Sequence, residues 1–202
     1  MKEILISVII GYILGSIPFA LVIGKIFYKT DIRNFGSKNL GGSNSGRVLG
    51  KKAGIAVMTL DVLKVIVAIG IASLIGNTEN VMIFAGFAAA IGHCYPVFAN
   101  FKGGKAVATL YGFLFGMAFF GTYNFTIFFV PFVTFLIVLY IWKIVSLASM
   151  CSSVFVTIYV GIIGGSALMV EILCLFAVLI IYRHRSNIKK MLHGVENKIS
   201  WM

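Results

Sequence analysis

Residues 106–142 read AVATLYGFLFGMAFFGTYNFTIFFVPFVTFLIVLYIW, a stretch of 37 residues without a formal charge. An α-helix needs about 20 apolar residues to cross the hydrocarbon core of a bilayer, so this stretch is too long for a single span. The Gly-Thr-Tyr-Asn sequence at 121–124 is typical of a turn between two helices. The stretch therefore predicts a pair of membrane-spanning helices joined by a short connection.

The remainder of the chain has the same character. Of its 202 residues, 60% are hydrophobic and 11% are charged. Soluble domains carry roughly 25% charged residues and disordered chains have low hydrophobicity, so the composition argues against both classes. The other apolar stretches are 4–23, in which Pro18 predicts a kink or an exit from the bilayer, 53–75, 81–97, and 144–182, which is divided at Gly164-Gly165-Ser166. The sequence predicts an all-α integral membrane protein with seven transmembrane helices in a single domain, residues 1–202.

The positive charges predict how these helices are oriented. Lys and Arg number 17 against six Asp and Glu, giving a net charge of +11. In a soluble protein this excess would suggest nucleic acid, but cytoplasmic loops of membrane proteins also collect Lys and Arg. Cations gather in the loop 29–52, at Lys102 and Lys105, at Lys143 and in the C-terminal tail, whereas the opposite side carries only Lys2. We therefore expect the N-terminus to lie outside and the C-terminus in the cytoplasm, and we expect no nucleic-acid partner.

The loop 29–52 has the composition of an anion-binding segment. Five glycines fall between Gly36 and Gly50, and glycine lets a ligand approach main-chain N–H groups closely. Neutral donors and a guanidinium group, both suited to phosphate oxygens, lie among them. They are Ser37, Asn39, Ser43, Asn44 and Arg47. The loop matches neither the Walker nor the dinucleotide glycine pattern, so nucleotide binding is not predicted. A flexible solvated connection is the alternative interpretation.

A second polar cluster lies at the end of the third apolar stretch. His93 closes that stretch, and Lys102-Gly103-Gly104-Lys105 sets two ammonium groups around a flexible pair, which suits phosphate. The segment lacks the Ser or Thr that follows the lysine of a Walker loop. A membrane histidine is either a packing residue or a group that faces a cavity or a partner.

Other polar residues interrupt the later apolar stretches. Asp61 and Lys64 are three residues apart on a predicted helix, so they share a face and either neutralise each other or contact a substrate. Ser146 and Ser149 open the sixth predicted span, and a basic tail leads to Glu196. That tail alone would suit anionic lipid headgroups. The three cysteines lack metal-ligand spacing, so no metal site is predicted.

In this order, these residues resemble the bacterial membrane-integral glycerol-3-phosphate acyltransferases that use acyl phosphate, the PlsY family. The segments that carry the resemblance are Ser16-Ile17-Pro18, Asp31-Ile32-Arg33, Gly36 to Asn39, Asn44, Arg47 to Gly50, Gly92-His93, Pro96 to Phe98, Lys102 to Lys105, Val107 to Thr109, Ser146 to Ser149, and Asn187 to Glu196. The chain departs from the family at Lys38, where Gly-Ser-Gly-Asn is usual, and at Gly42-Ser43, where Ala-Thr is usual. Both asparagines that follow are kept.

The resemblance implies a seven-helix enzyme of the bacterial inner membrane with its active site facing the cytoplasm. It implies transfer of a fatty acyl group from acyl phosphate to the 1-hydroxyl of glycerol 3-phosphate, giving lysophosphatidic acid and phosphate in phospholipid synthesis. The expected partners are these two substrates and membrane lipids, with no metal and no other cofactor.

The expected catalytic residues are Ser37 and Asn39, which hold the acyl phosphate, Lys105, which neutralises the leaving phosphate, and His93. His93 either removes the hydroxyl proton or only positions the hydroxyl group while a substrate phosphate oxygen takes the proton. The expected substrate-binding residues are Gly36, Gly41, Asn44, Arg47, Lys102, Gly103, Gly104, Ser146, Asn187 and Glu196. Of these, Arg47, Lys102, Asn187 and Glu196 are assigned to glycerol 3-phosphate.

Two other classes fit parts of the sequence. A small seven-helix carrier for an organophosphate anion would place charges or broken helices at mid-membrane in several spans. Here the charges within spans are Asp61, Lys64 and Glu171, while the other polar groups cluster on one predicted face. A structural subunit would explain the hydrophobicity but not the Gly, Asn and Lys clusters. The sequence therefore favours an enzyme.

Overall fold

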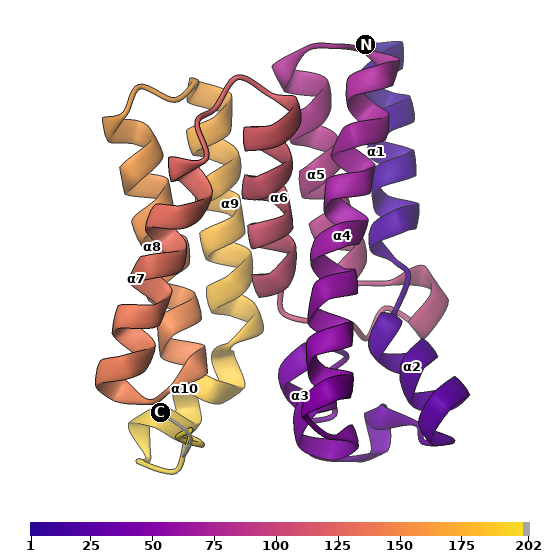
Figure 1. Cartoon of the computed structure of the whole chain (residues 1–202), viewed down its shortest axis with the longest axis vertical. Helices are drawn as coiled ribbons and strands as arrows, with labels where there is room; N and C mark the ends of the chain where they lie inside the picture. Colours follow the sequence, from indigo (N-terminus) through magenta and orange to yellow (C-terminus); the bar gives the residue numbers. More distant parts are fainter. Residues whose placement is uncertain (200–202) are drawn as a thin grey trace. The chain divides into compact units, whose positions relative to one another are not determined.

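The structure is a computed structural model that describes residues 1–199, and within them it contains ten α-helices, two short 3-10 helices and no strand (Figure 1). The helices form two compact units, Met1–Thr122 and Tyr123–Met202, and the last three residues lie outside the described part. The prediction of an all-α chain is confirmed for the described residues. The single-domain boundary 1–202 remains a prediction.

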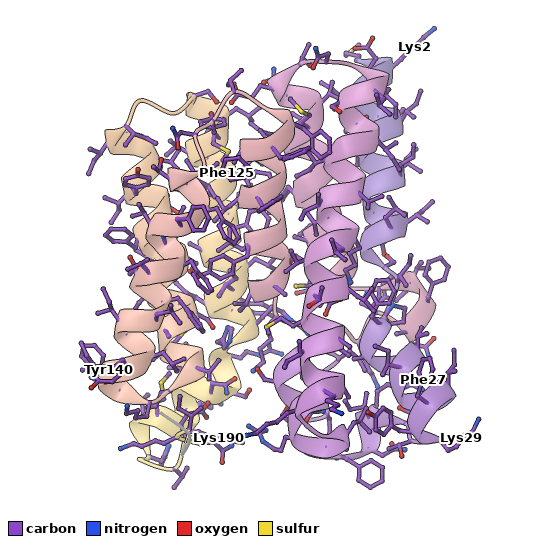
Figure 2. All side chains as sticks on the ribbon, viewed as in Figure 1. Lys2, Phe27, Lys29, Phe125, Tyr140 and Lys190 are labelled. Carbon is purple, nitrogen blue, oxygen red and sulfur yellow. The ribbon has the colours of Figure 1, made fainter. Side chains whose placement is uncertain are left out.

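The first unit is built on helices that run side by side (Figure 1). They are α1 (Lys2–Gly15), α4 (Lys51–Ile75), α5 (Glu79–Cys94) and α6 (Val107–Phe120). The shorter elements are α2 (Phe19–Tyr28), η1 (Ile32–Asn34), α3 (Gly42–Leu49) and η2 (Val97–Ala99). Figure 2 shows Lys2 and Lys29 at opposite ends of this unit. The predicted anion-binding loop therefore lies at the end away from the N-terminus.

The second unit consists of α7 (Thr126–Trp142), α8 (Val145–Ile162), α9 (Ala167–Arg183) and α10 (Arg185–Leu192), with α8 packed against both α7 and α9. The predicted breaks near residues 121–124 and 164–166 are both present. Ser166 begins α9 by accepting a hydrogen bond from the Met169 N–H at 3.2 Å, as helix N-cap serines do. Tyr123 and Ser166 are joined through their hydroxyl groups at 3.3 Å, which connects the two turns.

Breaks and local helices also modify the predicted elements of the first unit. The expected disruption at Pro18 is present, because α1 ends at Gly15 and α2 begins at Phe19. The segment 29–52, described from the sequence as a loop, contains η1 and α3, and α4 begins within it. Small residues explain α3: a Cβ added at Gly54 of α4 would lie 2.6 Å from the Gly46 Cα, so only glycine allows this close approach.

The outer surface of the described helices is strongly apolar. Large hydrophobic side chains are exposed on both units, including Phe27 at 74% and Tyr140 at 66%, and Figure 2 shows both on the outside of their units. Within residues 1–199, four segments are long and apolar enough to cross a membrane, Lys2–Tyr28, Lys51–Ile75, Glu79–Ala99 and Val145–Ile162. The pair α9 and α10, bent by 57°, would be a fifth, and α6 and α7 are apolar but shorter. The count of seven spans remains a prediction.

Close contact between α1 and α5 depends on glycine. A Cβ added at Gly15 would overlap the Ala89 carbonyl oxygen and lie 2.5 Å from the Ala89 Cα, and Gly11 meets Ala85 in the same way. Both contacts are with main-chain atoms, which cannot rotate away as a flexible side chain would. The two helices therefore pack at a separation that no larger residue permits.

Gly15→Ala is expected to lower the free energy of unfolding by about 1–3 kcal/mol, because overpacking forces α1 away from α5. The measurement is the Tm of the purified protein in detergent. Gly161→Ala is the matched control, since nothing lies within 4 Å of a Cβ at that position in α8. An equal Tm for Gly15→Ala and wild type would show that α1 and α5 do not pack as described.

Candidate functional site

Asn44 is buried inside the loop 29–52, the glycine-rich loop, and holds its main chain together. Its side chain is 2% exposed; its Oδ1 accepts a hydrogen bond from the Ser37 N–H at 2.8 Å. Its Nδ2 donates to the carbonyl oxygens of Phe35 at 3.3 Å and Asn39 at 3.1 Å. Buried amides are normally satisfied in this way. Asn44 was predicted to contact substrate, and what its polar atoms hold in the structure is the main chain of the loop.

Two loop residues adopt the left-handed backbone conformation. Gly36 has φ of +57°, and a Cβ there would overlap the Asn44 Oδ1. Lys38 has φ of +58°, a conformation that disfavours side chains by roughly 1–2 kcal/mol. Position 38 is where the resembled family usually has glycine, so the departure noted in the sequence places a lysine where the backbone favours glycine.

An ion pair fixes the start of the loop. Asp31 accepts hydrogen bonds from the Arg33 guanidinium at 2.6–3.2 Å and from the Arg33 N–H at 3.1 Å. The hydrogen bonds to the Arg33 side chain lower the pKa of Asp31 to about 2. Asp31 is therefore ionised at neutral pH, and Arg33 is committed to the loop rather than to a phosphate.

The glycine-rich loop meets the Lys-Gly-Gly-Lys segment, although 64 residues separate the contacting positions. Asn39 Nδ2 donates a hydrogen bond to the Gly103 carbonyl oxygen at 3.2 Å. The Gly104 N–H donates to the His93 carbonyl oxygen at 2.9 Å. A Cβ at Gly104 would overlap His93 Nε2, so the imidazole ring lies directly against that glycine. Three segments predicted to bind substrate thus come together in the first unit.

His93 also belongs to a buried charged cluster with Asp61 and Lys64. Lys64 Nζ lies 2.7 Å from Asp61 Oδ1 and 3.1 Å from His93 Nδ1, and His93 Nδ1 lies 3.4 Å from Asp61 Oδ1. The three residues are 5% exposed or less. The expected Asp61–Lys64 pairing is present, whereas sequence reasoning missed its contact with His93. Among the described residues, no group of three His, Cys, Asp or Glu could hold a metal ion.

The predicted cationic and hydroxyl groups lie at the more accessible positions of the first unit. Ser37, Arg47 on α3 and Lys102 are exposed, and Lys105 is half-buried just before α6 begins. Gly103 and Gly104 are both buried. The exposed cations leave charge available to an anion, while the buried glycine segment is held in place by its contacts with Asn39 and His93.

A second polar cluster forms within the second unit. Ser146 Oγ, at the start of α8, donates a hydrogen bond to Glu196 Oε1 at 2.8 Å, and Asn187 Nδ2 of α10 donates to the same oxygen at 2.6 Å. Glu196 Oε2 is buried, with no hydrogen-bond partner among the described residues. Ser146 and Asn187, two predicted residues of the C-terminal half, therefore both contact the third, Glu196, and its other carboxylate oxygen remains available to a donor.

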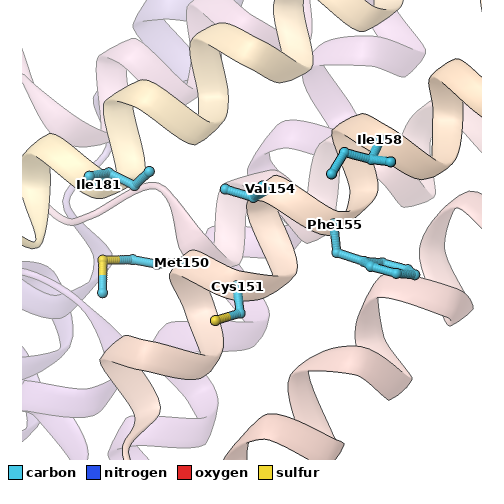
Figure 3. A pocket seen from close by; sticks show the side chains of 6 residues that line it. All are labelled: Met150, Cys151, Val154, Phe155, Ile158 and Ile181. Atoms are coloured by element: carbon cyan, nitrogen blue, oxygen red, sulfur yellow. The ribbon is translucent and has the colours of Figure 1, made fainter.

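The second unit also carries an apolar groove with a volume of about 460 Å³. It lies along α8, and Ile181 of α9 also lines it (Figure 3). Its lining residues are Met150, Cys151, Val154, Phe155, Ile158 and Ile181. None of the predicted site residues lines it, and its apolar surface suits hydrocarbon rather than phosphate chemistry.

The comparisons with known proteins agree with this arrangement. The chain matches the glycerol-3-phosphate acyltransferase family over residues 5–194. A glycerol-3-phosphate acyltransferase of Bacillus cereus is 43% identical over 193 residues, covering 96% of this chain and 93% of that protein. One from Enterococcus faecalis is 41% identical over 208 residues, covering 98% and 93%.

Solved structures support the fold as well. The crystal structure of PlsY, an integral membrane glycerol 3-phosphate acyltransferase, in its glycerol 3-phosphate form superposes with a TM-score of 0.89 at 37% identity, covering 98% of this chain and 96% of that one. Its lysophosphatidic acid form gives 0.86 at 36% identity, covering 98% and 95%. The membrane class predicted from the sequence agrees with these structures, and the resemblance is confirmed. The chain belongs to the PlsY family of glycerol-3-phosphate acyltransferases.

Proposed function

We propose that this protein transfers a fatty acyl group from acyl phosphate to the 1-hydroxyl of glycerol 3-phosphate, giving lysophosphatidic acid and inorganic phosphate. The observation that carries the proposal is the meeting of loop 36–44 with Lys102–Lys105 through the Asn39–Gly103 hydrogen bond. This contact assembles neutral donors, main-chain N–H groups and lysines in one place, which is the chemistry that a phosphate-bearing donor needs.

In the proposed reaction, the hydroxyl oxygen attacks the carbonyl carbon, and the bond between that carbon and the phosphate oxygen breaks. Phosphate is a good leaving group, so the protein mainly aligns the reactants and stabilises developing charge. Ser37, Asn39 and the loop N–H groups hold the acyl phosphate, and Lys105 neutralises the departing phosphate. The hydroxyl proton passes to a base, which is either His93 or an oxygen of a substrate phosphate.

Glycerol 3-phosphate offers a dianion and two hydroxyl groups to its binding residues. Arg47 and Lys102 are exposed cations suited to the phosphate. Glu196, held by Ser146 and Asn187, keeps one oxygen as an acceptor for a hydroxyl group. We assign Asn187 and Glu196 to the polar part of this substrate on that basis.

The proposed topology has seven spans in the bacterial inner membrane, an external N-terminus and an active site facing the cytoplasm. It is supported by the alternation of basic and neutral connections along the chain. A topology reporter fused after the last residue is expected to give a cytoplasmic signal. A periplasmic signal there would contradict the orientation.

The donor is tested with purified protein, labelled glycerol 3-phosphate, and either palmitoyl phosphate or a palmitoyl thioester. Labelled lysophosphatidic acid is expected with the phosphate donor alone. Product from the thioester alone would overturn the proposed donor. If neither donor gives product and reconstituted vesicles accumulate labelled glycerol 3-phosphate, the carrier interpretation replaces the enzyme.

A further inference from the structure

The ammonium group of Lys64 contacts three acceptor atoms in the interior of the first unit. Its Nζ lies 2.7 Å from Asp61 Oδ1, 3.0 Å from the Ile17 carbonyl oxygen and 3.1 Å from His93 Nδ1. The side chain of Lys64 is 2% exposed, so water does not compete for these contacts. An ammonium group has three N–H donors and no acceptor. Lys64 donates a hydrogen bond to the Ile17 carbonyl oxygen, contacts His93 Nδ1 at hydrogen-bond distance and forms an ion pair with Asp61, so His93 Nδ1 is its third acceptor.

Charge balance favours a charged Lys64 ammonium group beside a neutral His93 ring. Asp61 supplies one negative charge, which the Lys64 ammonium neutralises. His93 Nδ1 lies 3.1 Å from the Lys64 ammonium group and 3.4 Å from Asp61 Oδ1. A proton on Nδ1 would set an N–H donor against the N–H donor at the shorter distance, and full protonation of the ring would add a second buried cation.

We infer that Lys64 is a positioning residue that fixes His93 as a neutral ring, with Nδ1 as an acceptor and the proton on Nε2. His93 Nε2 faces Gly104, because a Cβ at Gly104 would overlap it. The ring thus presents a donor N–H to the Lys102–Lys105 segment. The functional part of this inference rests on the proposed function, whereas the position of the proton does not.

This proton arrangement decides between the two roles of His93. Removal of the hydroxyl proton by Nε2 requires an unprotonated Nε2, and in a neutral ring the proton must then sit on Nδ1, facing the Lys64 ammonium. That arrangement removes one of the three acceptors of Lys64. With the opposite tautomer, His93 donates a hydrogen bond and does not act as the base.

Lys64 also connects this ring to the helix break that precedes it in the chain. Its bond to the Ile17 carbonyl oxygen ties the interruption between α1 and α2 to α4, and its bond to His93 ties α4 to the end of α5. The His93 carbonyl oxygen in turn accepts the Gly104 N–H. One buried side chain therefore orients three helix ends beneath the Lys-Gly-Gly-Lys segment.

The test is nitrogen-15 NMR of protein labelled in its histidine rings, in detergent at neutral pH, with the His93 signals assigned by their loss in His93→Asn. A neutral ring protonated at Nε2 is expected for wild type. In Lys64→Met, Asp61 loses its ammonium partner and still lies 3.4 Å from Nδ1, so His93 is expected to become an imidazolium ion. Lys52→Met, an exposed change on the same helix, is the control and should leave the signals unchanged.

A wild-type ring protonated at Nδ1 or at both nitrogens would overturn the inference, as would an unchanged ring in Lys64→Met. If Lys64→Met does not fold, Asp61→Asn with Lys64→Met removes both buried charges together. A mixture of the two neutral tautomers is then expected, and an unchanged Nε2–H ring would contradict the role of Lys64.

Enzyme kinetics test the positioning role independently. The double variant should lose roughly 10- to 100-fold in kcat because the His93 ring is misaligned, with little change in KM for glycerol 3-phosphate. An unchanged kcat would show that Lys64 has no positioning role. If acyl phosphate is not the donor, the NMR result for wild type is unaffected, so the two failures are distinguishable.

Discussion

Lys105→Ala is expected to reduce kcat/KM for acyl transfer from palmitoyl phosphate by at least about 100-fold. Lys105 is half-buried and follows the glycine pair that contacts both Asn39 and His93. In the proposed reaction its ammonium group neutralises the departing phosphate. A preorganised donor that stabilises developing charge contributes roughly 10²–10³ in rate. Steady-state kinetics with purified variants measure the effect.

The matched control for this change is Lys2→Ala. Lys2 is an exposed lysine of the same unit, at the end opposite the glycine-rich loop (Figure 2). It should retain wild-type activity, which separates a local effect from the loss of one positive charge. Retained activity in Lys105→Ala, with unchanged affinity for acyl phosphate, would remove Lys105 from the site.

Gly104→Ala is expected to reduce kcat by about 100-fold or more, although it adds only a methyl group. The added Cβ would overlap His93 Nε2 and lie 2.9 Å from His93 Cδ2. Because the contact between Lys64 and Nδ1 fixes the other side of the ring, the main chain of residues 102–105 must move instead. That movement breaks the Gly104–His93 hydrogen bond and shifts the Gly103 carbonyl oxygen away from Asn39. A misplacement of about 1 Å at a reacting centre can reduce the rate 100-fold.

Gly161→Ala again serves as the control, because its Cβ would meet nothing within 4 Å. Size-exclusion profiles and Tm values establish that both variants are folded before their rates are compared. A folded Gly104→Ala protein with wild-type kcat would show that the segment does not need its contact with His93.

The helix pattern could be predicted from the sequence because its breaks are local. Pro18, the turn at 121–124 and the turn at 164–166 each interrupt a helix through their own backbone preferences, and each break is present. The helix α3 was not predictable in the same way. Its sequence, GSNSGRVL, is rich in residues that favour turns, and it forms because Gly46 and Gly54 let it lie directly on α4.

The site residues could be named from their chemistry, but their partners could not. From the sequence alone Asn44 is equally suited to bind phosphate, but in the structure its amide holds the loop. The main-chain carbonyl oxygens of Phe35 and Asn39 accept its hydrogen bonds, and their placement around it depends on how the loop folds. Asp61 and Lys64 share a helix face, so their pairing was predictable. Their contact with His93 depends on the position of α4 along α5. A local sequence pattern does not predict that position.

Binding of a non-transferable acyl phosphonate tests most directly whether the glycine-rich loop and the Lys-Gly-Gly-Lys segment bind the acyl-phosphate donor. Titration of the purified protein should give saturable binding that acyl phosphate displaces and an acyl thioester does not. Lys105→Met should weaken that binding by tenfold or more, roughly 1.4 kcal/mol, while Lys2→Met leaves it unchanged. Equal affinity of wild type and Lys105→Met, or equal displacement by the thioester, would contradict the proposed acyl-phosphate site.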